Sequence, residues 1–135
     1  MGLTQSVQKS KYKNEQLCQD TLHQIFSGYK FIKCRPSFLR NPKTGRCLEL
    51  DCYNDQLKIG VEYNGKQHYT QVAFFQNHDQ FIKQQERDKL KIELCKKNNI
   101  KLLVVPYTVK NIPEYINTWV DQNNLRITRN FCTII

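Results

Sequence analysis

Residues 47–64 read CLELDCYNDQLKIGVEYN, and this stretch decides how the rest of the chain is arranged. Apolar and polar residues alternate over residues 47–53 and again over residues 57–64, which is the period of a β-strand. The polar residues 54–56 lie between the two runs and predict a tight turn. The stretch therefore predicts a β-hairpin.

The flanking sequence predicts the other elements from hydrophobic period and from end signals such as Ser27-Gly28. In chain order they are a helix from Ser10 to about Phe26, a strand over residues 29–34, a turn over residues 41–45, a helix from Asp79 to about Asn98, a strand over residues 100–107 and a helix led in by Asn111 and Pro113. The order α-β-β-β-α-β-α predicts one α/β domain over residues 1–135, a central mixed β-sheet flanked by helices. We expect residues 1–9 to be flexible and residues 125–135 to form a tail or an edge strand.

The chain is strongly basic, with 21 Lys and Arg against 12 Asp and Glu and a net charge of +9. Such a charge favours nucleic acid as the partner, and an inert basic surface kept for solubility is the alternative. The longest apolar run, residues 102–105, is too short to cross a bilayer, so no membrane partner is predicted.

The six cysteines contain no CxxC pair, and the first residues lack the apolar core of a signal peptide. We therefore expect an intracellular protein of the cytoplasm or nucleus. A zinc site from Cys47, Cys52 and His68 and myristoylation at Gly2 are minor alternatives. The richness in Asn, Lys, Ile and Tyr is typical of an AT-biased genome, and a virus is one candidate source.

Two acids of the hairpin are candidates for chemistry. Leu57, Val61 and Tyr63 point to one face of the second strand, so Glu62 points to the other. Asp51 ends the preceding strand, and two carboxylates from neighbouring strands are suitable ligands for Mg²⁺. The alternative is that both acids are ordinary solvated residues on the exposed face of the hairpin.

The predicted register does not bring these acids together by itself. With a flush turn at residue 55, Asp51 faces residue 59, and Glu62 lies about 10 Å further along at ~3.3 Å per residue. Strand twist, a bulge or the end of the pairing has to close this distance.

Residues 48–53 (LELDCY) and 59–69 (IGVEYNGKQHY) resemble the PD-(D/E)xK nuclease superfamily. These two segments are most similar to the branch of very-short-patch-repair endonucleases. In that branch an acid ends one strand, and the pattern Glu-x-(Asp/Asn)-Gly-x-Gln-His ends the next strand. The resemblance covers roughly Glu15 to Tyr107. It implies a restriction-endonuclease-like fold and a Mg²⁺- or Mn²⁺-dependent DNA endonuclease of repair, recombination or junction processing.

The resemblance also implies roles for individual residues. Asp51 and Glu62 match the metal-binding acids, the Tyr63 carbonyl matches a third ligand, and Glu15 matches an acid that many members place beside the metal from the first helix.

The sequence departs from the superfamily at one position. The usual Lys stands two residues after the Glu, where this chain has Asn64. In some members a later Gln replaces that Lys, which Gln67 matches, and Lys66 is the alternative. If neither reaches the scissile phosphate, the site binds nucleic acid without cutting it.

Other polar residues are candidates for supporting roles. The candidate phosphate contacts are Lys30, Lys33, Arg35, Lys66, His68, Arg87, Lys89, Lys91, Lys96 and Lys97. A solvated helix face and a structural histidine are the alternatives. Asp88 resembles a supporting acid of the related nucleases, and Trp119 is expected in the core rather than as a base-stacking platform.

The sequence therefore leaves two candidate functions. One is a metal-dependent DNA endonuclease, and the other is a non-catalytic nucleic-acid-binding module with a degenerate site. The choice of DNA over RNA, the substrate structure and the formation of a homodimer stay open.

Overall fold

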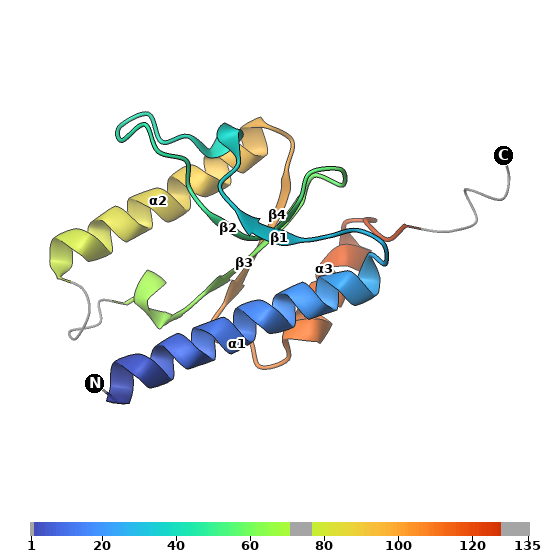
Figure 1. Cartoon of the computed structure of the whole chain (residues 1–135), viewed down its shortest axis with the longest axis horizontal. Helices are drawn as coiled ribbons and strands as arrows, with labels where there is room; N and C mark the ends of the chain where they lie inside the picture. Colours follow the sequence, from blue (N-terminus) through green and yellow to red (C-terminus); the bar gives the residue numbers. More distant parts are fainter. Residues whose placement is uncertain (1, 71–76, 128–135) are drawn as a thin grey trace, which may run out of the picture.

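The computed structural model describes residues 2–70 and 77–127, and for residues 2–8 and Ser10 the backbone only. Its elements are α1 (Gly2–Ile25), β1 (Ile32–Cys34), the 3-10 turn η1 (Ser37–Leu39), β2 (Leu50–Asn54), β3 (Ile59–Asn64), the 3-10 turn η2 (Lys66–His68), α2 (His78–Lys97), β4 (Lys101–Pro106) and α3 (Ile112–Gln122). The predicted order α-β-β-β-α-β-α is confirmed (Figure 1).

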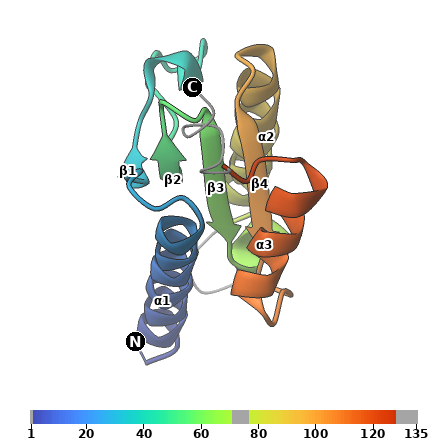
Figure 2. The ribbon, with the colours of Figure 1, turned by 90° about the vertical axis from the view of Figure 1, so that its right-hand side faces the viewer.

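The strands form one mixed sheet in the order β1-β2-β3-β4. β2 is antiparallel to β1 and β3, whereas β4 runs parallel to β3, and α2 supplies the crossover connection that a parallel pair needs. Figure 2 shows α1 and α3 on one side of the sheet and α2 on the other. The predicted fold class, an α/β domain with a mixed sheet flanked by helices, is confirmed.

Each face of the sheet has its own core. Between the sheet and α1 with α3 lie Cys18, Leu22, Phe26, Cys52, Ile59, Val61, Tyr63, Leu103, Val105, Ile116 and Val120. Between the sheet and α2 lie Leu48, Leu50, Tyr53, Cys95 and Ile100. Every residue of β2 and β3 is buried, because helices cover both faces. The alternative of a solvated hairpin face is therefore wrong.

The end signals of the helices act as predicted. Gly28 takes φ +92° just after α1, a conformation that favours glycine. Asn111 caps α3 by accepting a hydrogen bond from the Glu114 N–H, with Pro113 in the first turn.

Two predicted boundaries are wrong. α1 begins at Gly2, before the predicted cap at Ser10. Residues 125–127 form no strand, and the rest of the predicted edge strand lies outside the described residues. Within residues 2–70 and 77–127, no helix is long and apolar enough to cross a membrane.

Candidate active site

The loop of the hairpin sets the register of the two acids. The loop spans residues 55–58, longer than the predicted turn, with Lys58 at φ 57° and Asn54 Oδ1 accepting a hydrogen bond from the Leu57 N–H at 2.8 Å. Asn54 pairs with Ile59 and Cys52 with Val61. Continuing this register places Asp51 beside Glu62, so the expected pairing of Asp51 with residue 59 is wrong.

A bulge in β2 then turns Asp51 out of the ladder. Ile32 pairs with Tyr53 and Cys34 pairs with Leu50, so β2 contains one more residue than β1 between these pairs. Asp51 lies in this bulge, and its Oδ2 accepts a hydrogen bond from the Tyr63 backbone N–H at 2.9 Å. The carboxylate thus bonds an N–H of the partner strand where the β2–β3 pairing ends.

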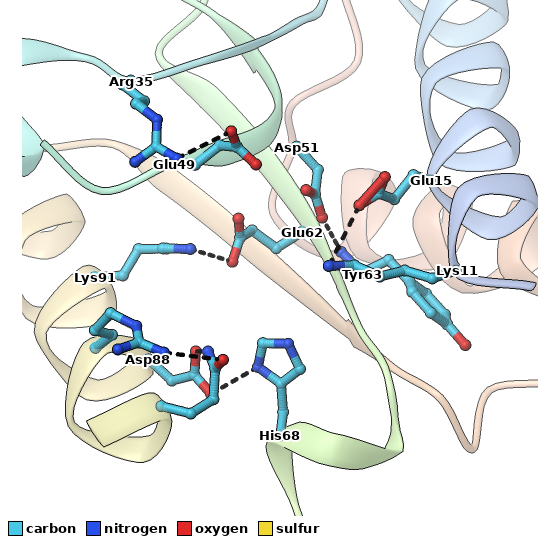
Figure 3. A network of polar contacts seen from close by, with 12 residues as sticks. Lys11, Glu15, Arg35, Glu49, Asp51, Glu62, Tyr63, His68, Asp88 and Lys91 are labelled. Atoms are coloured by element: carbon cyan, nitrogen blue, oxygen red, sulfur yellow. Dashed lines mark hydrogen bonds and ion pairs between the residues drawn. The ribbon is translucent and has the colours of Figure 1, made fainter. Parts of the chain in front are cut away.

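A polar cleft of about 290 Å³ opens between this point of the sheet and α2. Asp51 and Glu62 both line it, and Figure 3 shows their carboxylates with the neighbouring groups. The other lining residues are Lys11, Arg35, Leu48, Glu49, Tyr63, Asn64, Gln67, His68, Gln84, Arg87 and Lys91. The cleft therefore combines two buried acids with several cations.

Both acids are almost inaccessible to solvent, with 9% of Asp51 and 5% of Glu62 exposed. Burial, followed by the nearby Glu62 and Glu15 carboxylates, raises the pKa of Asp51 to about 7, although the hydrogen bond from Tyr63 opposes this shift. The positive charge and hydrogen-bond donors around Asp51 therefore do not offset the cost of burying its ionised carboxylate.

Lys91 of α2 compensates the second acid. Its Nζ lies 2.7 Å from Glu62 Oε2, and only 13% of the Lys91 side chain is exposed. Burial raises the pKa of Glu62, and Lys91 opposes that rise. The sequence predicted Lys91 only as a phosphate contact, whereas the structure puts its ammonium beside Glu62.

His68 is held in the cleft wall by α2. Its Nδ1 lies 2.8 Å from Asp88 Oδ2, and the Gln84 amide donates to Asp88 Oδ1 at 3.1 Å. An ionised Asp88 favours the tautomer with the proton on Nδ1, which leaves Nε2 as the free ring nitrogen. Asp88 thus supports His68 by position, and sequence reasoning missed Gln84.

The two predicted substitutes for the missing Lys lie differently. Gln67 lines the cleft, and its Oε1 is buried with no hydrogen-bond partner among the described residues. Lys66 is exposed and does not line the cleft, because η2 starts directly after Gly65 and turns it outward. The structure therefore brings Gln67, and not Lys66, to the acids.

Glu15 approaches Asp51 from the side of α1. Both residues line a second cavity of about 240 Å³, with Lys33 at its edge. Glu15 forms ion pairs with Lys33 at 3.1 Å and Lys11 at 3.9 Å, and within the described structure its buried Oε1 accepts no hydrogen bond. Asp51 therefore lies between the two cavities, with Glu15 on one side and Glu62 on the other.

The remaining predicted residues divide into two groups. Arg35 and Arg87 line the cleft, whereas Lys30 lines neither cavity.

In the part of the chain that the structure describes, no three His, Cys, Asp or Glu side chains are grouped to hold a metal ion. The zinc alternative from Cys47, Cys52 and His68 is therefore not supported.

A sequence signal for the helical wall exists. Gln84, Arg87, Asp88 and Lys91 follow the spacing i, i+3, i+4 and i+7, which places them on one face of a helix. Leu90 and Leu94 of the same helix pack on the core. The four polar residues lie on the neighbouring face, and such a polar face beside an apolar one indicates that it faces a polar cavity.

Comparison with known proteins gives relatives but no activity. No family model matches the chain, and no solved structure matches it. Protein 307L of Invertebrate iridescent virus 6 is 52% identical over 92 residues, or 64% of this chain and 47% of the relative. Protein 033L of Invertebrate iridescent virus 3 is 53% identical over 81 residues, or 59% of this chain and 42% of the relative.

This chain spans less than half the length of these two proteins. Protein 094L of Frog virus 3 (isolate Goorha) is 46% identical over 111 residues, which cover 81% of this chain and 71% of the relative. None of the three names states an activity. The identity and coverage show that the chain belongs to the same family of iridovirus proteins as 094L.

Proposed function

We propose that the chain is a Mg²⁺-dependent endonuclease that hydrolyses phosphodiester bonds of DNA, with Mn²⁺ as an alternative ion. The observation that carries the proposal is the pair of buried carboxylates, Asp51 and Glu62, in one cleft with Lys91. Buried acids destabilise a fold unless positive charge or hydrogen-bond donors compensate them. A cleft that keeps two of them, both with a raised pKa, is a candidate for function.

The donor set of the cleft fits a hard divalent cation. Mg²⁺ in phosphoryl-transfer sites takes one or two carboxylates and completes its shell with waters and substrate oxygens. Asp51 and Glu62 supply the carboxylates, and the Gln67 side chain, which lines the same cleft, is the proposed group that orients the attacking water. The Tyr63 carbonyl stays a predicted ligand. Bound Mg²⁺ supplies polarisation of the phosphoryl oxygen and a lowered pKa of water.

In the proposed reaction, Lys91 takes the place of the superfamily lysine from a different element. Its ammonium favours the ionised form of Glu62 through the 2.7 Å ion pair and provides donors for the negative charge that develops on the phosphoryl group. Fixed charges that line the cleft are effective here, because they need no reorganisation during the reaction.

His68 is the proposed proton acceptor. Asp88 holds its Nδ1–H, so the free Nε2 can take a proton from the attacking water and return one to the leaving oxygen. Arg35 and Arg87, which line the same cleft, bind the phosphates on either side of the scissile bond.

The test is cleavage of a panel of single-stranded, duplex, flap and four-way-junction DNA and of RNA, with Mg²⁺, Mn²⁺ or EDTA. The wild type is compared with Glu62→Gln, which keeps the shape of the side chain. We expect cutting that needs the metal and is lost in Glu62→Gln. Equal cutting by both proteins, or cutting in EDTA, contradicts the proposal.

One observation favours a second candidate, a nucleic-acid-binding module without catalysis. Glu62 already has a cationic partner in Lys91, so its charge is compensated without a metal. In that case the panel is bound with a steep salt dependence but stays intact, and Glu62→Gln binds as tightly as the wild type.

A further inference from the structure

A second, larger hollow lies next to the cleft, between α2 and the loop of residues 40–47. Its volume is about 710 Å³, and Figure 1 shows the loop reaching out at the same end of the molecule as α2. We call it the loop groove. Its lining residues are Arg35, Asn41, Pro42, Lys43, Thr44, Arg46, Cys47, Leu48, Lys83, Glu86, Arg87, Lys89, Leu90 and Glu93.

The loop side of the groove is fixed by its own hydrogen bonds. The Asn41 N–H donates to the Arg46 carbonyl and the Gly45 N–H to the Asn41 carbonyl, both at 2.8 Å. The Asn41 and Thr44 side chains accept from the N–H groups of Lys43 and Arg46. Gly45 takes φ +74°, which completes the turn. The groove therefore has a preformed wall.

The floor and the rim of the groove differ in chemistry. Leu48 and Leu90 pack on the core beside α2, and with Pro42 they give an apolar floor. Six basic residues line the groove against two acidic ones, Glu86 and Glu93. An apolar surface surrounded by cations fits a nucleotide, whose base is flat and apolar on its faces and whose phosphate is anionic.

The loop groove continues into the cleft of the carboxylates. Arg35, Leu48 and Arg87 line both hollows. The Arg35 guanidinium donates to the Cys47 carbonyl at 3.0 Å and approaches Glu49 at 3.5 Å, which fixes it at the junction. A strand whose phosphate lies at Asp51 and Glu62 therefore reaches the groove with its next nucleotides.

We propose that the loop groove binds an unpaired nucleotide of the DNA strand that is cut, with its base on Leu48 and Leu90 and its phosphate at the rim. This inference rests on the proposed function and names its substrate class. A paired base is stacked inside a duplex and does not enter a groove walled by a helix and a loop, whereas an unpaired base does so at little cost. The substrate is therefore DNA with an unpaired segment next to the scissile bond.

The test measures binding in EDTA, where no cleavage occurs, by fluorescence anisotropy of a labelled 12-nucleotide DNA strand. We expect the single strand to bind more tightly than the duplex of the same sequence. Replacing one base at a time by an abasic site should weaken binding at least about fivefold at one or two adjacent positions. Equal weakening at every position, or none at any, overturns the proposal.

Matched charge reversals locate the effect. Lys43→Glu with Lys83→Glu changes two exposed residues of the groove and should weaken binding by about tenfold or more. Lys101→Glu with Lys110→Glu changes two exposed residues that line neither hollow and should weaken binding much less. An equal loss in both pairs overturns the proposal.

The two proposals fail separately. A position-dependent abasic effect in a chain that cuts nothing supports the groove and removes the nuclease. Metal-dependent cutting together with a flat abasic scan keeps the nuclease and removes the groove.

Discussion

The ammonium of Lys91 lies 2.7 Å from Glu62 Oε2, although 29 residues separate the two in sequence and they belong to different layers of the fold. The pair is nearly closed to solvent, with 13% and 6% of the two side chains exposed. Each charge depends on the other, because a buried charge without a partner is strongly destabilising. Lys91 is therefore expected to matter for stability as well as for the proposed reaction.

Lys91→Met should reduce metal-dependent cleavage by about 100-fold or more, since it removes a fixed charge from the cleft. It should also lower the free energy of unfolding by about 3 kcal/mol at pH 8, because Glu62 is left without a partner. Single-turnover cleavage and urea denaturation measure the two effects.

Lys96→Met is the control for Lys91→Met, since Lys96 is exposed on the last turn of the same helix and lines neither hollow. It should behave like the wild type in both measurements. A Lys91→Met protein that cuts at the wild-type rate would show that Lys91 is only a structural partner of Glu62.

The metal-free protein should become less stable as the pH rises. The pKa of Asp51 is raised to about 7 from an ordinary value of 3.8, chiefly by burial, and the pKa of Glu62 is raised as well. Between these values the folded state holds protons that the unfolded state has released, so unfolding becomes easier as the pH rises through this window. In EDTA we expect a loss of a few kcal/mol from pH 5 to pH 8.

Asp51→Asn should remove most of this loss and be more stable than the wild type at pH 8 in EDTA. Mg²⁺ should raise the melting temperature of the wild type at pH 8 and leave that of Asp51→Asn nearly unchanged. Asp55→Asn, which changes an exposed carboxylate, should keep the wild-type decline between pH 5 and pH 8. Parallel stability curves for wild type and Asp51→Asn would contradict the assignment.

His68→Ala should lower kcat by about 100-fold or more, as expected for the loss of a general base. Asp88→Asn should lower it by about 10- to 100-fold, because the ring loses the acceptor that orients it. The KM should change little in either variant if His68 acts as the proton acceptor, whereas a raised KM with an unchanged kcat would make His68 a phosphate contact instead. Steady-state kinetics on the preferred substrate of the panel measure these values.

The control for His68 is His78→Ala, because His78 is exposed at the start of α2 and lines neither hollow. It should leave kcat unchanged. If His68→Ala also leaves kcat unchanged, His68 is a structural histidine that fixes η2 to α2.

Local sequence was sufficient for the type and order of the elements, whereas the choice of Asp51 and Glu62 as site residues came from the resemblance to a nuclease superfamily. Alternation gave β2 and β3, and helical period with Asn111 and Gly28 gave the helices and two of their ends. The register was not predictable in the same way, since it depends on Lys58 at positive φ and on the bulge at Asp51. Neither feature has a signal in the residues themselves, because Lys58 is not a residue type that favours positive φ and the bulge at Asp51 depends on how β2 pairs with β1.

The partner of Glu62 was harder to predict for a different reason. Lys91 reaches the cleft because α2 packs on the sheet through Leu90, Leu94 and Cys95, which turns the next face of the helix toward β3. Spacing identifies that face but not what it meets. Lys91 is far from Glu62 in sequence but beside it in the structure. Lys66 is close to Glu62 in sequence, yet its side chain is exposed.

Gly65→Ala should reduce cleavage through Gln67 while leaving the fold intact. A Cβ at position 65 would lie 2.6 Å from Gln67 Oε1, closer than the two atoms can approach. Gly65 has φ −70°, which alanine adopts without strain, and the obstructing atom is the end of a flexible side chain. The variant should therefore melt within a few degrees of the wild type, with the Gln67 amide displaced from the cleft.

The activity of Gly65→Ala should fall to the level of Gln67→Ala, and the double variant should be no worse than either single one. This lack of additivity is expected when both changes remove the same interaction. Single-turnover rates of the three variants test it. Additive losses would mean that the backbone at Gly65 contacts the substrate itself, and a normal rate in Gln67→Ala would exclude Gln67 from the site.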